Sequence, residues 1–111
     1  MKHSEMINNL GIKIAYLLLK HKADLDVSIY MNNNRLTFRD YKFIFNSHID
    51  VSEITEYSNK HSITMTFEGD FYHALNYNSN PLLVKKFIAL LKEYGYYYEM
   101  GNAWNLALYK I

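Results

Sequence analysis

Three segments of this chain alternate apolar and polar residues, and this alternation restricts the fold more than any other sequence feature. The segments are 26–39, 62–77 and 96–109, and each has a turn-like stretch near its middle. A period of two places apolar side chains on one face of a β-strand. Each segment is therefore predicted to form a β-hairpin with one buried face and one wetter face.

The first hairpin is predicted to turn at Asn33 and Asn34, because asparagine tolerates the positive φ angles of a two-residue hairpin turn. This turn pairs apolar residues on the buried face: Met31 with Leu36, and Ile29 with Phe38. The opposite face receives the remaining pairs: Tyr30 with Thr37, and Ser28 with Arg39. A slip of one residue would exchange the two faces, so polarity specifies which face is buried.

The other two segments favour three-residue loops by the same criterion. A loop at 68–70 pairs Phe67 with Phe71 and places His73 on the apolar face, where a hydrogen-bonded core histidine is the expected role. A loop at 101–103 aligns three pairs on the buried face of the last hairpin: Met100 with Trp104, Tyr98 with Leu106, and Tyr96 with Leu108.

Two further segments have the 3.6-residue period of amphipathic helices. In 4–22, Ser4 is the expected N-cap, and the stripe consists of Ile7, Leu10, Ile14, Leu17 and Leu18. In 81–94, the expected N-cap is Asn80, the first helical residue is Pro81, and Gly95 follows the end. The stripe of this second helix is predicted to consist of Val84, Phe87, Ile88, Leu91 and Tyr94.

The stretch 40–61 has the weakest pattern. The alternation changes parity after Arg39 and Asp40, which suggests a bulge or corner there. A short helix from Tyr41 fits the spacing, but the aromatic and β-branched composition favours a strand. The predicted order is α-β-β-β-(uncertain)-β-β-α-β-β. The fold is predicted to be α+β, with a mostly antiparallel sheet and both helices packed on one face.

Composition supports one packed domain over residues 1–111. The absence of Cys excludes disulfide-stapled and zinc-ribbon classes, and an apolar half of the residues argues against a disordered chain. No signal-peptide pattern and no long apolar run are present, so we expect a cytoplasmic protein without a membrane span. Abundant Lys, Asn, Ile and Tyr with only two Arg indicate an AT-rich genome, such as that of a low-GC bacterium or its phage.

The sequence shows no recognisable catalytic arrangement. It has no Cys nucleophile, and its four glycines are dispersed, so a phosphate-binding loop is not predicted. His48, Asp50, Glu53 and His61 lie near one another in sequence, but their spacing matches no metal-ligand motif. We therefore expect neither an enzyme nor a bound metal or cofactor.

The leading hypothesis is a non-catalytic protein-binding module. The overall net charge is +1, but residues 41–80 hold two lysines and five carboxylates, a local net charge of −3. Tyrosines on wetter strand faces are candidate interface anchors, although they also suit a half-buried sheet. The predicted partner-binding residues combine both features: Tyr72, Tyr97, Tyr109, Glu53, Glu56 and Asp70. An accessory protein of a phage or mobile element, inhibiting a host enzyme or defence system, would fit this description.

Two other functions remain open. One is a nucleic-acid binder that uses Lys85, Lys86, Lys92 and the tyrosine-rich final hairpin, although a stripe of basic residues is missing. The other is a small enzyme with an unrecognised site around His48 and His61. The small, aromatic chain also suggests a homodimer, paired through an exposed strand edge at 103–111.

Overall fold

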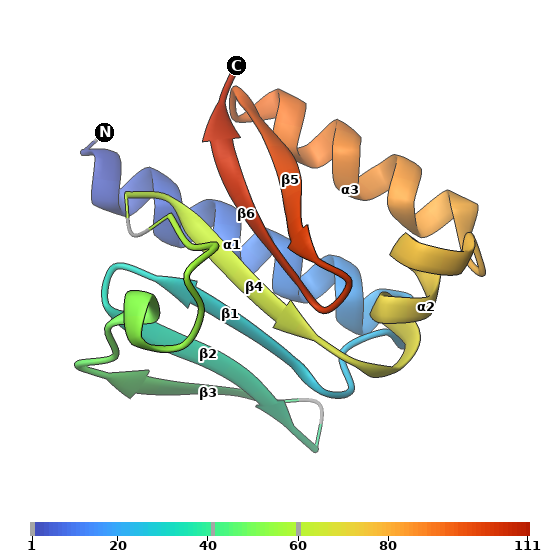
Figure 1. Cartoon of the computed structure of the whole chain (residues 1–111), viewed down its shortest axis with the longest axis horizontal. Helices are drawn as coiled ribbons and strands as arrows, with labels where there is room; N and C mark the ends of the chain where they lie inside the picture. Colours follow the sequence, from blue (N-terminus) through green and yellow to red (C-terminus); the bar gives the residue numbers. More distant parts are fainter. Residues whose placement is uncertain (1, 41, 60) are drawn as a thin grey trace.

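A six-stranded antiparallel sheet with helices against one face organises the computed structural model of this chain (Figure 1). The structure describes residues 2–40, 42–59 and 61–111. The elements in chain order are α1 (His3–Lys20), β1 (Val27–Met31), β2 (Asn34–Arg39), β3 (Lys42–Ser47), the short 3-10 helix η1 (Val51–Glu53), β4 (Ile63–Phe67), α2 (Gly69–Tyr77), α3 (Pro81–Glu93), β5 (Tyr96–Asn102) and β6 (Asn105–Lys110).

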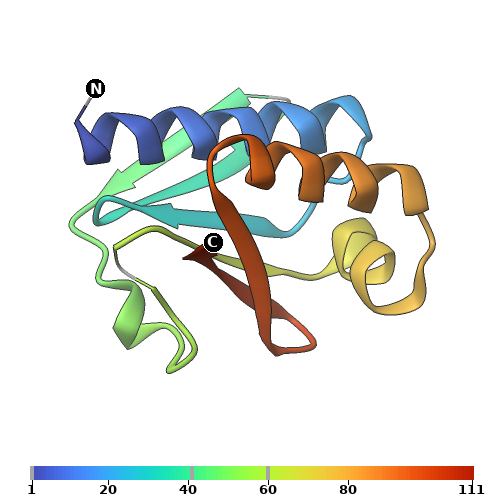
Figure 2. The same ribbon diagram turned by 90° about the horizontal axis from the view of Figure 1, so that it is seen from above.

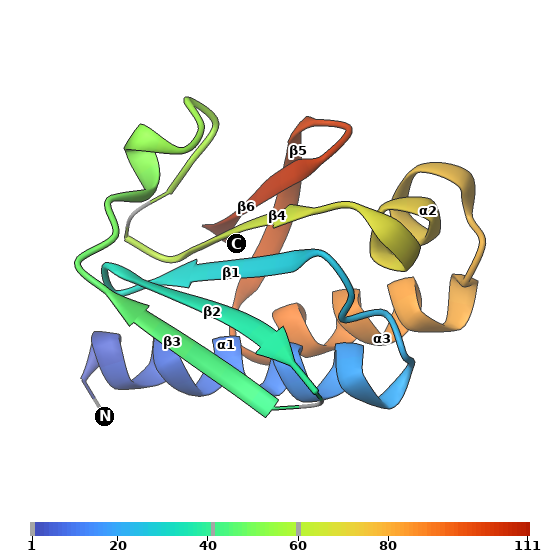
Figure 3. The same cartoon turned by 90° about the horizontal axis from the view of Figure 1, so that it is seen from below.

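The prediction of an α+β fold with an antiparallel sheet is confirmed. The strand order is β3-β2-β1-β4-β6-β5, and every neighbouring pair is antiparallel. The helices α1 and α3 contact each other and lie on one side of the sheet (Figure 2). The segment 48–59 lies on the opposite side, so the sheet has one face covered by helices and one helix-free face (Figure 3).

The core forms between the helix layer and alternate strand residues. The stripe predicted for α1 is largely confirmed, with Ile7, Leu10, Ile14 and Leu18 fully buried. In α3 the buried stripe is Leu83, Phe87 and Leu91, whereas Ile88 is 43% exposed. The prediction for Ile88 was therefore wrong. The face of α3 that packs is set by its contacts with α1 and β5, which the sequence period alone does not define.

The signals at the helix ends are mostly confirmed. The Oδ1 atom of Asn80 accepts a hydrogen bond from the Leu83 amide at 3.2 Å, and Pro81 is the first residue of α3. Gly95 follows α3 with a φ of 83°, a value that favours glycine. Ser4 is not the N-cap of α1, because the helix begins at His3 and Ser4 lies in its first turn.

The first hairpin has the predicted two-residue turn, one residue earlier than expected. Asn32 and Asn33 have φ angles of 51° and 61°, and Ile29 pairs with Leu36. Three consecutive asparagines satisfy the turn requirement equally well, so the position of the turn was ambiguous. The pairing moved by two residues, and a shift of two leaves every side chain on its predicted face.

The predicted hairpin at 62–77 was wrong, because the second half of this segment is α2. Phe71 and Ala74 are buried at helical spacing, and His73 is exposed instead of lying on the apolar face. Both edges of β4 are already occupied, one by β1 and the other by β6. A strand at 71–77 would therefore have no place beside β4, and the chain packs there as a helix.

The last hairpin also differs from its predicted register. Asn102 pairs with Asn105 and Met100 with Leu106, so Trp104 lies in the turn rather than on the buried face. An irregularity between Met100 and Asn102 absorbs the extra residue. That residue is Gly101, and a Cβ atom there would overlap the Cβ atom of Tyr57.

The strand pairing decides two sequence predictions, one about a strand after residue 40 and one about the dimer edge at 103–111. The strand predicted after residue 40 is confirmed as β3. Its register with β2 is regular from the Asn34–Ser47 pair to the Arg39–Lys42 pair, so no bulge interrupts these described residues. Tyr41, the predicted start of an alternative short helix, lies outside the described residues. The proposed dimer edge at 103–111 was wrong, because β6 lies inside the sheet between β4 and β5. Among the strands of the described residues, β3 and β5 are the two at the edges of the sheet.

Stability should fall at alkaline pH because of Tyr96. This side chain is 2% exposed, and burial raises the pKa of its phenol above the ordinary value near 10. The folded state thus retains this proton to higher pH than the unfolded state. Its stabilising contribution is present below about pH 10 and is lost as the pH rises through the folded-state pKa. Urea unfolding across the alkaline range should show a smaller decline for Tyr96→Phe than for the unmodified chain.

Candidate functional site

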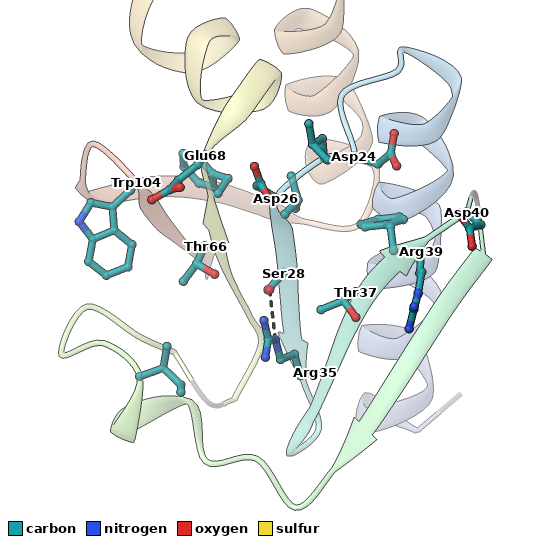
Figure 4. A pocket seen from close by; sticks show the side chains of 15 residues that line it. Asp24, Asp26, Ser28, Arg35, Thr37, Arg39, Asp40, Thr66, Glu68 and Trp104 are labelled. Carbon is teal, nitrogen blue, oxygen red and sulfur yellow. Dashed lines mark hydrogen bonds between the residues drawn. The ribbon is translucent and has the colours of Figure 1, made fainter.

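The helix-free face of the sheet contains a hollow with a polar floor. Ser28 of β1 pairs with Thr66 of β4, and Thr37 of β2 lies on the same face (Figure 4). These three side chains are short, while longer side chains border them on several sides. The result is an open cavity of about 630 Å³, which we call the sheet hollow.

Apolar side chains from three separate connections form part of the rim of the sheet hollow. They are Leu25 from the α1–β1 connection, Ile54 directly after η1, and Trp104 from the β5–β6 turn. All three are exposed, and Trp104 is 42% exposed although it is the only tryptophan of the chain. The backbone of Trp104 is fixed to the sheet, since its carbonyl accepts a hydrogen bond from the Phe67 amide at 2.8 Å.

Both arginines of the chain line the sheet hollow. Arg35 and Arg39 stand four residues apart on β2, so their side chains leave the same face of the strand. The Nε–H of Arg35 donates to the Ser28 hydroxyl at 3.1 Å, and its guanidinium lies 5.9 Å from the ring centroid of Tyr30. Within the described residues, no carboxylate forms an ion pair with either guanidinium.

The side chains of Asp26 and Glu68 lie at one end of the sheet hollow, and Arg35 lies at the other end (Figure 4). Asp26 precedes β1 and Glu68 follows β4, and these ends are adjacent because the two strands are antiparallel. The Glu68 amide donates to the Asp26 carbonyl at 3.1 Å, which holds the two residues side by side. Asp24 and Asp40 complete the acidic lining, so one hollow contains two positive and four negative side chains.

A buried asparagine holds the 51–59 segment over the sheet. Asn105 is fully buried, and its side-chain amide donates to the Thr55 hydroxyl at 3.3 Å and to the Tyr57 carbonyl at 3.1 Å. Its Oδ1 atom accepts from the Asn102 amide at 3.1 Å. The same side chain therefore ties the β5–β6 turn to the segment that carries Ile54.

The predicted partner-binding residues do not form one cluster. Tyr97 and Tyr109 are neighbours on the helix-free face, with ring centroids 6.1 Å apart. Tyr72 and Asp70 lie on α2, where a hydrogen bond with Tyr77 raises the pKa of Tyr72. Glu53 belongs to η1, and Glu56 is exposed in the segment that follows. None of these six residues lines the sheet hollow.

Sequence reasoning missed the residues that do line the hollow. The alternation correctly placed Ser28, Thr37 and Arg39 on the wetter face, but it gave no reason to select them. One signal was available in the sequence: Arg35 and Arg39 are an even number of residues apart in one strand, so their side chains lie on the same face. Trp104 was missed because the predicted three-residue loop put it on the buried face, whereas the two-residue turn exposes it.

The histidines proposed for an enzymatic site have different neighbours. His48 lines a small surface hollow of about 260 Å³ with Asn33, Ile49 and Asp50. The carbonyl of His61 lies 2.7 Å from the His3 imidazole, near the start of α1. In residues 2–40, 42–59 and 61–111, no group of three or more His, Asp or Glu side chains could hold a metal ion. Across the same residues, no helix combines the length and hydropathy needed to cross a membrane.

Comparisons with protein families, curated proteins and solved structures gave no match.

Proposed function

We propose that this chain is a small non-catalytic protein-binding module that binds its partner with the helix-free face of the sheet. The observation that carries this proposal is the composition of the sheet hollow. The single tryptophan and both arginines of the chain line it, although they come from different strands and turns. Trp, Tyr and Arg are the residue types that contribute most binding energy in protein interfaces.

The arrangement of the sheet hollow supports this function. An apolar anchor such as Trp104 contributes most where it is held rigidly beside groups that a partner can bury. Here the floor is a β-sheet and the backbone of Trp104 is hydrogen-bonded to it. Tyr97 and Tyr109 extend the same face with aromatic surface, so part of the predicted tyrosine interface remains in the proposal.

A nucleic-acid interface is less well supported. Lys85 and Lys86 are exposed on α3 in the helix layer, whereas Tyr97 and Tyr109 are on the helix-free face. Lys92 does line a surface hollow with Tyr97, but Lys85 and Lys86 are not among the residues of that hollow. One nucleic-acid segment would therefore contact only part of the proposed set. The sheet hollow itself is net negative, which opposes phosphate groups.

Three more specific hypotheses from the sequence remain proposals: an inhibitory accessory protein, a cytoplasmic location and a homodimer. An accessory protein that inhibits a host enzyme or defence system would use this face to cover a functional surface of its target. The absence of Cys suits a reducing compartment such as the cytoplasm. Pairing of two copies through β5 would leave the sheet hollow free, because that edge lies beyond β6.

Replacing Trp104 with alanine should abolish partner retention. Interface tryptophans of this kind contribute about 2–4 kcal/mol, which corresponds to a loss of roughly 30-fold or more in affinity. The measurement is affinity capture from lysates of cells that naturally produce the chain. Tyr16→Ala is the matched control, because Tyr16 is a 61% exposed aromatic residue on α1 in the helix layer. Equal retention by all three proteins would contradict the proposed face.

A further inference from the structure

We propose that the sheet hollow recognises a protein segment of mixed charge, with an acidic side chain bound to Arg35 and a basic side chain beside Asp26 and Glu68. This inference rests on the proposed function and adds the chemistry of the partner. It follows from the unused donors of Arg35 and from the position of the carboxylates in the same hollow.

Arg35 is prepared to bind a carboxylate. Its Nε–H is used by Ser28, and its guanidinium lies over Tyr30, so the side chain is already oriented. The N–H donors of both terminal amino groups remain for a ligand, and their planar geometry matches the two oxygens of a carboxylate. Because the orientation exists before binding, little side-chain entropy would be lost on forming this pair.

Asp26 and Glu68 provide a complementary position for a cation. Their residues are held adjacent by the hydrogen bond between the Glu68 amide and the Asp26 carbonyl. No lysine or arginine forms an ion pair with either carboxylate in the part of the chain that the structure describes. A basic side chain from a partner would therefore find two carboxylates that have no competing intramolecular cation.

The two positions lie along β1. Asp26 directly precedes β1 with a φ of 60°, and Ser28, the second residue of β1, accepts the hydrogen bond from Arg35. Arg35 and Asp26 therefore line the same hollow near the start of one strand. One short peptide segment could bring an acidic side chain to Arg35 and a basic side chain to Asp26 and Glu68. The expected motif has an acidic residue and a basic residue close together in sequence.

The charge balance favours a peptide over a nucleic acid. The lining of the sheet hollow has four carboxylates and two guanidiniums, a formal net charge of −2. A phosphate backbone brings repeated negative charge and would be repelled by Asp26 and Glu68. A segment with one carboxylate and a nearby cation satisfies both ends of the hollow.

The test is selection of random linear peptides displayed on phage against the full chain. We expect enrichment of peptides with an acidic and a basic residue close together in sequence. Binding of the enriched peptide should weaken about tenfold or more with Arg35→Gln and less with Arg35→Lys, which retains charge but not the planar donors. Lys86→Gln, on the exposed face of α3, should bind like the unmodified chain.

Charge reversal at Arg35 distinguishes a loss of peptide recognition from a loss of folding. Arg35→Glu should lose the selected peptide and bind the peptide in which the acidic residue is replaced by lysine, while circular dichroism confirms the fold. Enriched peptides without an acidic residue, binding unaffected by Arg35→Gln, or failure to enrich any peptide would overturn this inference. Arg35-dependent binding of a single-stranded oligonucleotide in preference to peptides would also overturn it. The Trp104→Ala capture experiment decides the proposed function separately, because it does not depend on charge.

Discussion

Replacing Phe71 with alanine should lower the free energy of unfolding by about 3–5 kcal/mol. The Phe71 ring is fully buried between two other aromatic rings, with centroids 5.2 Å from Phe67 and 5.4 Å from Phe87. Its removal would leave a cavity where α2, α3 and β4 meet. Since a small domain has a total stability of about 5–15 kcal/mol, this variant should unfold at much lower denaturant concentration.

The control for this prediction is His73→Ala. His73 is exposed on α2, so its replacement should change stability by no more than about 0.5 kcal/mol. In the hairpin that the sequence pattern suggested, His73 would instead lie in the core beside Met65. Chemical denaturation of both variants thus separates the two folds. A large loss for His73→Ala with a small loss for Phe71→Ala would contradict the helix.

Replacing Asn105 with alanine should cost about 3 kcal/mol and release the 51–59 segment. The change removes three hydrogen bonds and leaves the Tyr57 carbonyl and the Asn102 amide without their side-chain partner. Each such loss in a buried environment costs about 1 kcal/mol or more. Because this segment positions Ile54 at the sheet hollow, partner binding should weaken as well.

Amide hydrogen exchange measures the release directly. Protection in 51–59 and at the β5–β6 turn should decrease in Asn105→Ala, while α1 should exchange as before apart from the global loss of stability. Asn46→Ala is the control, because Asn46 is exposed on the edge strand β3. Unchanged exchange in 51–59 would show that Asn105 does not hold the segment.

Local signals in the sequence predicted those parts of the fold that neighbouring residues determine. Asn80 and Pro81 mark the start of α3 because capping involves only adjacent backbone groups. The faces of β1 and β2 were predicted correctly even though the pairing moved by two residues. The helix in the segment 68–77 was not predicted, because Phe67 and Phe71 are four residues apart, and this spacing suits a helix and a strand equally well. Only the occupied edges of β4 decide between them.

The sheet hollow depends on contacts between residues distant in the sequence. Leu25, Glu68 and Trp104 meet because β4 lies between β1 and β6, which brings the start of β1, the end of β4 and the β5–β6 turn to one end of the sheet. No sequence pattern predicts this strand order. The rarity of Arg and Trp could have suggested these residues, but not that they share one hollow.

The central claim is that a partner binds at the sheet hollow, and site-specific photocrosslinking tests it most directly. A photoreactive phenylalanine derivative is placed at Leu25, on the rim, or at Leu82, another exposed leucine, on α3. In cells that naturally produce the chain, the derivative at position 25 should form an adduct that Trp104→Ala abolishes, and position 82 should form none. Adducts from position 82 alone, or adducts at position 25 that persist in Trp104→Ala, would contradict the account.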